Sequence, residues 1–134
     1  MAAAKAAFPT WAALSPKQRG VYFKRLAALI REARDELAYL EAISMGRPVG
    51  DYWDAGAAAY EFDYYAETGY DAQGTSSLNT PGYVNVSFRQ PYGVVAAIIP
   101  WNVPVLFFSN KTAPALAAGN TVVVKSSEKA PLTV

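Results

Sequence analysis

The sequence predicts an α/β fold in which long helices precede a strand–helix–strand unit. Two apolar runs support this, Val94–Ile99 and "TVVVK" at Thr121–Lys125, because strands buried on both faces of a parallel sheet are apolar throughout. The stretch between them, from about Val105 to Ala118, is predicted as a helix. The three elements would form a βαβ unit, whose crossover is expected to be right-handed.

Upstream, the stretch from Leu14 to Pro48 is predicted as one long helix. Ser15 suits the N-cap and Pro16 the first helical position, while Gly46 and Pro48 end the pattern. Apolar residues spaced by three or four trace one face of this helix: Tyr22, Leu26, Leu29, Ile30, Ala33, Leu37 and Leu40.

A second helix is predicted in "DYWDAGAAAYEFDYYAETGY", with Asp51 as its cap and Gly69 at its end. Its aromatic stripe is expected to pack in the core rather than to bind a ligand, since helical spacing of this kind is typical of core residues. The stripe consists of Trp53, Ala57, Tyr60 and Tyr64.

A loop and an isolated strand come next. "DAQGTSSLNTPG" is rich in turn residues and is predicted as a loop. Tyr83–Gln90 alternates apolar and polar residues, as a half-exposed strand does. The sequence offers it no hairpin partner, so we expect it to pair elsewhere. Within the later helix, Pro114 is expected to cause a kink or a break.

Composition excludes several function classes. The chain of 134 residues has a net charge of +1 and no basic run, so no nucleic acid partner is expected. It contains no cysteine and no histidine, which removes disulfides, thiol chemistry and the commonest metal ligand. No apolar run reaches the ~18 residues of a membrane helix, and the N-terminus lacks a signal-peptide pattern. We therefore expect no metal, no membrane partner and a cytoplasmic location.

Two polar clusters follow the two predicted strands, where ligands of open α/β sheets bind. "PWN" contains Asn102, and "KSSE" contains Lys125 and Glu128. A lysine and a glutamate can jointly bind neighbouring hydroxyls, and an acidic residue after a strand is the usual holder of a ribose diol. The glycine-rich turn G-x-G-x-x-G is missing. Two simpler interpretations therefore stay open: Asn102 caps the following helix, or Lys125 and Glu128 form a surface ion pair.

The segment from Pro91 to Val134 resembles the NAD(P)-dependent aldehyde dehydrogenase superfamily. "PYGVVAAIIPWNVP", "KTAPALAAGN" and "VVKSSEKAPL" supply nearly every element of the family's pattern, in order and in register. "AAFPTWAALSPKQRGVYFKRLAALI" and "LEAISMGRP" resemble the family's first long helices. The resemblance covers essentially the whole chain.

The resemblance implies roles for nine residues. Asn102 would form part of the oxyanion hole, donating to the oxygen that becomes negative when a thiolate attacks the aldehyde. Ile99, Pro100 and Trp101 would line the nicotinamide-ribose side of NAD, and Ile98 and Asn102 would also belong to the cofactor site. Lys125 and Glu128 would hold the adenosine ribose hydroxyls, with Ser126 and Ser127 beside them in the same cofactor-binding turn. Position 126 departs from the frequent K-P-S-E form, and Glu128 favours NAD while NADP remains open.

The fold implied is part of a Rossmann-like NAD-binding domain with N-terminal helices and an oligomerisation strand. Residues 1–80 would be mainly helical, 83–90 the oligomerisation strand, and 91–134 the βαβ part. The complete enzyme is expected to be an oxidoreductase that oxidises a small aldehyde to a carboxylic acid, as a homodimer or homotetramer.

The family's catalytic cysteine and general base have no counterpart in these residues. We therefore interpret the chain as an N-terminal fragment that is inactive alone. The alternatives are a non-catalytic short chain that binds full-length subunits through Tyr83–Gln90, and a generic nucleotide-binding module. The sequence does not identify the aldehyde.

Overall fold

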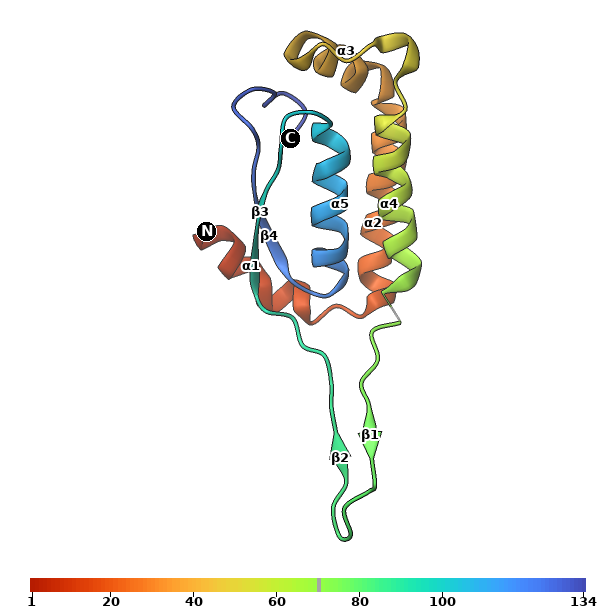
Figure 1. Ribbon diagram of the computed structural model, residues 1–134, viewed down its shortest axis with the longest axis vertical. Helices are drawn as coiled ribbons and strands as arrows, with labels where there is room; N and C mark the ends of the chain where they lie inside the picture. The colour runs from red at the N-terminus through yellow and green to blue at the C-terminus, as the bar shows by residue number, and fades with distance from the viewer. Residues whose placement is uncertain (70) are drawn as a thin grey trace.

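The computed structural model describes residues 1–69 and 71–134, and these hold five α-helices, one short 3₁₀ helix and four strands (Figure 1). The helices are α1 (Ala2–Ala12), α2 (Pro16–Glu32), α3 (Arg34–Met45), η1 (Val49–Asp51), α4 (Asp54–Thr68) and α5 (Pro104–Ala117). The strands are β1 (Ser76–Ser77), β2 (Asn85–Val86), β3 (Val94–Ile98) and β4 (Thr121–Lys125). No helix within the described ranges is long and apolar enough to cross a membrane.

Helix α2 begins where the sequence predicts. Ser15 Oγ accepts a hydrogen bond from the Gln18 amide at 3.3 Å, and the Gln18 side chain accepts one from the Ser15 amide at 2.8 Å. This reciprocal pair is a capping box, and Pro16 occupies the first turn. The predicted start is therefore confirmed.

The prediction of a single long helix is wrong. The chain leaves helical geometry at Ala33, where ψ is 7°, and α3 then runs across the end of the α2–α4–α5 layer to Gly46 (Figure 1). Arg34 fixes the new direction, because its Nη2 donates to the Tyr52 carbonyl at 3.1 Å. The break comes from this tertiary contact and not from a glycine or a proline.

The prediction for α4 is right about its end at Gly69 and wrong about its start and its buried face. Asp51 lies in η1, and the residue before α4 is Trp53. The aromatic stripe of Trp53, Tyr60 and Tyr64 is exposed. A small-residue face is buried instead: Ala55, Ala58, Ala59, Phe62 and Ala66. Tyr70, the last residue of the predicted stretch, lies outside the described residues.

The core lies between α2, α4 and α5, and small residues let these helices pack closely. Phe23 and Phe62 meet edge to face with ring centroids 5.7 Å apart. A Cβ atom on Gly20 would stand 2.8 Å from the Ala66 carbonyl oxygen, so only glycine allows this approach of α2 to α4. Of the stripe predicted for α2, Ile30 is buried but Tyr22 and Leu29 are exposed, because Phe23 and Ala27 face the core.

A two-stranded arm projects from the body (Figure 1). Strands β1 and β2 pair antiparallel, with Ser76 opposite Val86 and Ser77 opposite Asn85. The expectation that Tyr83–Gln90 has no hairpin partner is therefore wrong, as is the prediction of a plain loop before it. Strand β1 consists of two serines, which lack the β-branched or aromatic side chains typical of strands, so the sequence does not predict it. The alternating side chains Val84, Val86 and Phe88 are all exposed.

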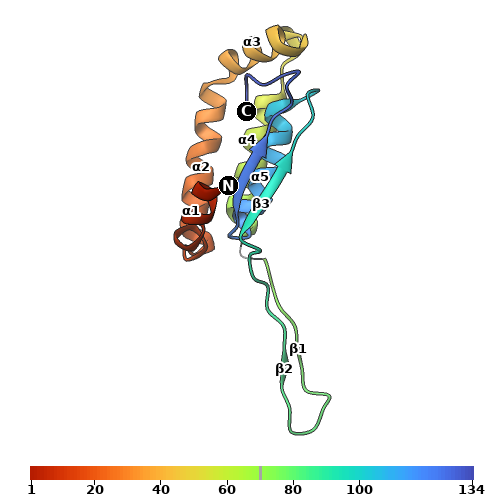
Figure 2. The same cartoon turned by 90° about the vertical axis from the view of Figure 1, so that its left-hand side faces the viewer.

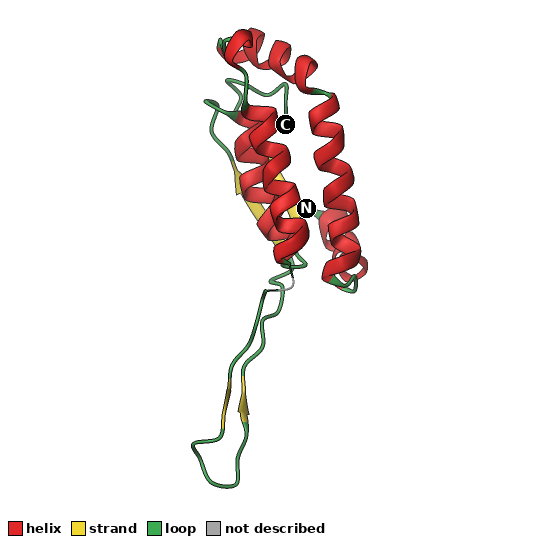
Figure 3. Ribbon diagram, turned by 90° about the vertical axis from the view of Figure 1, so that its right-hand side faces the viewer, coloured by secondary structure: helices red, strands yellow, loops and turns green. Residues whose placement is uncertain are grey.

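Strands β3 and β4 are parallel and joined through α5, which confirms the βαβ unit. Helix α5 packs against this pair, and α4 lies on the side of α5 away from the strands (Figures 2 and 3). The prediction of burial on both faces is wrong for the described residues: Ile98 is 79% exposed. Helix α5 is one continuous helix with Pro114 inside it, so the predicted break is absent. Gly119, at φ 88°, ends it as predicted.

Candidate functional site

The two polar turns predicted to meet do lie side by side. Ile98 stands opposite Lys125 in the parallel register, and the Ile99 amide donates to the Lys125 carbonyl at 3.1 Å. The residues that follow β3 and those that follow β4 therefore leave the sheet at the same edge. This is the edge at which open α/β sheets bind ligands.

The first turn presents Asn102 to solvent. Asn102 is exposed, and its side-chain amide makes no hydrogen bond within the described residues. The interpretation of Asn102 as a helix cap is wrong, because the N-cap of α5 is Val103 and no side chain from the cap position bonds the helix. The amide is therefore available to a ligand. Pro100 and Trp101 beside it are exposed as well.

The second turn presents an ion pair. Lys125 Nζ lies 2.8 Å from Glu128 Oε2, and both side chains are exposed. The hydrogen bond from Lys125 lowers the pKa of the Glu128 carboxyl, which is therefore ionised at neutral pH. Ser127 Oγ accepts from the Lys129 amide at 3.3 Å, while Ser126 is half-buried. A carboxylate and an ammonium held together can accept from and donate to two neighbouring hydroxyls.

The two isoleucines at the end of β3 differ in exposure. Ile98 is largely exposed at the end of β3, whereas the Ile99 side chain is only 3% exposed and faces the body of the chain. Among the predicted cofactor residues, Ile99 has a buried side chain, and only its backbone amide takes part in joining the two turns. Ile98 and Trp101 are both exposed near the end of β3.

A buried carboxyl that the sequence does not mark as functional lies behind both turns. Glu41, on α3, is fully buried. Its Oε1 accepts from the Val105 amide at 3.1 Å and from Thr133 Oγ1 at 3.2 Å. Burial raises the pKa of this carboxyl, and the two hydrogen bonds oppose the rise. A signal was present in the sequence, since Glu41 follows Leu37 by four residues on the apolar face of its helix.

Glu41 belongs to a wider buried polar cluster. Asp54 is fully buried and accepts from Arg47 through both oxygens, Nε–Oδ2 at 2.6 Å and Nη2–Oδ1 at 3.0 Å. The Arg47 guanidinium also lies over the Trp53 ring at 5.4 Å. The Tyr52 hydroxyl lies beside Glu41 but outside hydrogen-bonding geometry, and burial raises its pKa.

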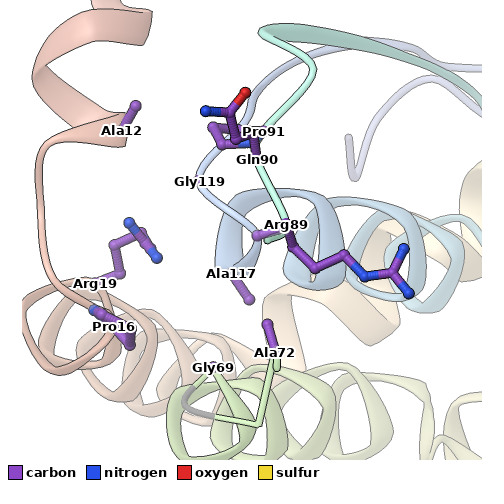
Figure 4. A pocket seen from close by; sticks show the side chains of 11 residues that line it. Ala12, Pro16, Arg19, Gly69, Ala72, Arg89, Gln90, Pro91, Ala117 and Gly119 are labelled. Carbon is purple, nitrogen blue, oxygen red and sulfur yellow. The ribbon is translucent and has the colours of Figure 1, made fainter. Parts of the chain in front are cut away.

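A cavity of about 320 Å³ lies at the opposite end of the strands (Figure 4). It is lined at the arm's base by Pro91, at the start of β4 by Gly119, and on α2 by Arg19. Arg19 is buried, donates to the Leu14 carbonyl and has a lowered pKa because of burial. This position, at the amino ends of the strands, is not the ligand edge of such a sheet. The described residues contain no group of three or more potential metal-ligating side chains.

A parallel strand pair joined by a helical crossover, with polar side chains after both strands, is the arrangement expected of a ligand-binding α/β domain. The family is more specific. The model of the aldehyde dehydrogenase family matches residues 1–134, and the chain belongs to that family.

Curated relatives and solved structures agree with this assignment. The chain is 38% identical over 137 residues to the NADP/NAD-dependent aldehyde dehydrogenase PuuC of Escherichia coli K12, covering 99% of this chain and 28% of that protein. It is 46% identical to gamma-glutamyl-gamma-aminobutyraldehyde dehydrogenase of Burkholderia cenocepacia J2315, with a TM-score of 0.92 over 98% of this chain and 28% of that one. PnpE in complex with nicotinamide adenine dinucleotide superposes equally well, at 44% identity, a TM-score of 0.92 and the same two coverages. The chain therefore spans little more than a quarter of the length of these proteins.

Proposed function

We propose that these residues form part of the cofactor site and of the oxyanion hole of an NAD(P)-dependent aldehyde dehydrogenase, an oxidoreductase that converts an aldehyde to a carboxylic acid. The observation that carries the proposal is the meeting of the Asn102 turn with the Lys125–Glu128 pair at one sheet edge. NAD, when bound, accepts the hydride that leaves the aldehyde carbon. The nucleophilic thiolate has to come from outside these 134 residues, which hold no cysteine.

Asn102 would stabilise the developing oxyanion. Its exposed amide has two N–H donors and no partner within the described residues, so it needs no rearrangement to donate. A donor aimed at charge that appears only in the transition state lowers the barrier by about 3 kcal/mol. Asn102 therefore acts on the reaction rate more than on aldehyde binding.

Lys125 and Glu128 would bind the adenosine ribose hydroxyls, with Ser126 and Ser127 beside them. Pro100 and Trp101 would contact the nicotinamide-ribose side together with Ile98 and the Ile99 backbone. An ionised Glu128 accepts hydrogen bonds from hydroxyls and repels a 2′-phosphate, so we propose NAD as the preferred cofactor over NADP.

The test uses the protein expressed from its complete reading frame. Aldehyde-dependent NADH formation is measured for the unchanged protein, for Asn102→Ala and for the matched control Asn110→Ala, an exposed asparagine on α5. We expect Asn102→Ala to lower kcat about 10²-fold and the control to leave it unchanged. Equal rates for all three proteins, or a frame that stops after Val134, would refute the proposal. The 134-residue chain alone is expected to be inactive.

The exposed arm supports a second candidate, a short non-catalytic chain that binds full-length subunits. One edge of β2 is paired with β1, and the apolar side chains in and beside it, Val84, Val86 and Phe88, are exposed. An added strand or a partner surface could cover them. In the complete enzyme the same arm would join subunits of a homodimer or homotetramer. Light scattering of the protein with and without Val86→Lys tests whether the arm mediates association, because only an arm-mediated complex should dissociate. A reading frame that stops after Val134 would favour the short chain, and one that continues would favour the complete enzyme.

We propose the cytoplasm as the compartment. Two relatives in Malus domestica are peroxisomal aminoaldehyde dehydrogenases, so a peroxisomal location is the alternative. Cell fractionation with an antibody to the chain separates the two.

A further inference from the structure

One oxygen atom joins three parts of the chain that are far apart in sequence. Glu41 Oε1, on α3, accepts the Val105 amide of α5 and the Thr133 hydroxyl near the end of the chain. The first contact spans 64 residues and the second 92. Both lie immediately beyond the strand-end turns, one after Asn102 and the other after Glu128.

The contact with Val105 replaces a missing helix cap. The first turn of α5 contains Pro104, which has no N–H, and Val103 supplies no capping side chain. The Val105 amide is therefore the first free donor of α5. It is buried, so without Glu41 it would lose its hydrogen bond with no water to replace it. A carboxyl at this end of a helix is also favoured by the helix dipole.

The contact with Thr133 restrains the second turn. Between Lys125 and Thr133 the chain forms turns and no helix or strand, and the first anchors after β4 are the buried Ala130 and this hydroxyl. Both hydrogen bonds end on Glu41 Oε1. A shift of either turn would therefore move this oxygen and distort the hydrogen bond to the other turn. Glu41 is itself fully buried, so it does not meet substrate or cofactor.

We propose that Glu41 is a positioning residue, which sets the distance between the Asn102 turn and the Lys125–Glu128 turn. The inference rests on the proposed dehydrogenase function. It assigns to α3 a part in the site, although α3 contributes no residue to the ligand edge itself.

The experiment compares Glu41→Ala with Glu41→Gln in the protein from its complete reading frame. Glutamine keeps an oxygen acceptor for Val105 and Thr133, whereas alanine removes it. Glu36→Ala, an exposed glutamate on the same helix, is the matched control. The readouts are hydrogen exchange of the peptide around Val105, the Kd of NAD without aldehyde, and kcat.

We expect Glu41→Ala to speed exchange around Val105, weaken NAD binding and lower kcat, each by about tenfold. Glu41→Gln and Glu36→Ala should stay within about twofold of the unchanged protein. The loss in kcat caused by Glu41→Ala should be smaller in the Asn102→Ala background. Once the Asn102 amide is gone, misplacing its turn costs no further oxyanion stabilisation. Should Glu41→Ala not fold, Thr133→Val removes one of the two bonds and should weaken NAD binding alone.

Two results would overturn the inference. One is exchange around Val105 that Glu41→Ala leaves unchanged, and the other is a kcat loss that simply adds to that of Asn102→Ala. Failure of the proposed function looks different: Asn102→Ala would then be as active as the unchanged protein, while Glu41→Ala would still speed exchange around Val105.

Discussion

Phe62 and Phe88 are the same residue type in two regions with opposite surroundings. Phe62 lies on α4, has no exposed surface and packs against Phe23 and Phe108. Phe88 lies in the arm and is 71% exposed. The helical body thus encloses its own core, whereas the arm leaves its apolar side chains open.

The strand-end site lies between these extremes. Helix α5 packs against β3 and β4 (Figure 2), while Ile98, at the end of β3, and Trp101, in the turn after it, are exposed. Large uncovered apolar patches mark places where other surfaces bind. We infer that α2, α4 and α5 are held by their own contacts, while the arm and the sheet edge depend on what covers them.

The largest expected effect breaks the enclosed core. Phe62→Ala should lower the free energy of unfolding by about 4 kcal/mol, since it removes a fully buried ring and leaves a cavity. Phe88→Ala should change it by less than about 0.5 kcal/mol at protein concentrations that keep chains apart. Urea unfolding followed by tryptophan fluorescence measures both. Similar losses for the two variants would contradict the contrast between body and arm.

The next effect concerns a buried charge. Arg47→Ala would leave the fully buried Asp54 carboxylate without its two guanidinium bonds, at a cost of about 3 kcal/mol in unfolding free energy. The control is Glu67→Ala, which removes an exposed partner of Lys24 and should cost under about 1 kcal/mol. If Arg47→Ala were as mild as its control, Asp54 would have to gain solvent or another partner.

A third test separates close helix packing from helix propensity. Gly20→Ala puts a methyl group against the Ala66 carbonyl and should destabilise the protein by about 2 kcal/mol. Gly56→Ala, on the open face of α4 with nothing within 4 Å, should stabilise it by up to about 1 kcal/mol. Thermal unfolding gives both signs. Stabilisation by both variants would show that α2 and α4 move apart without loss.

Several features were predictable because they depend on neighbouring residues. The capping box at Ser15 and Gln18, the stop at Gly119 and the strand–helix–strand order all follow from local spacing and chemistry. The meeting of the two turns follows from strand order, since adjacent parallel strands end at one edge.

Other features depend on contacts that local sequence does not encode. The break at Ala33 is set by Arg34 reaching Tyr52, 18 residues away. Helix α4 has aromatic residues on one side and alanines on another, and hydrophobicity alone predicts that the aromatic side is buried. The alanines are buried instead, because α2 approaches closely at Gly20. The position of Glu41 on the apolar face of its helix indicates burial, but local spacing does not encode its partners Val105 and Thr133, which lie 64 and 92 residues away.

The smallest expected effect is a pH dependence of the unfolding free energy. It arises from Glu41, which is buried in the helical body. Burial raises the pKa of Glu41 and nearby Asp54 adds to the rise, while the hydrogen bonds from Val105 and Thr133 oppose it. A carboxyl whose folded pKa exceeds its unfolded pKa binds more protons in the folded state over the interval between them. Its contribution to stability is therefore complete at acid pH and is lost as pH rises above about 4 towards the folded pKa.

Glu41→Gln cannot ionise, so its unfolding free energy minus that of the unchanged protein should increase over this interval and then level off. Urea unfolding at a series of pH values measures the difference, and Glu36→Gln corrects for the removal of a carboxylate from α3. A difference that falls as pH rises would show that the Val105 and Thr133 bonds outweigh burial at neutral pH. Glu41 would then be anchored by charge, and the glutamine variant would no longer be the neutral partner in the positioning experiment.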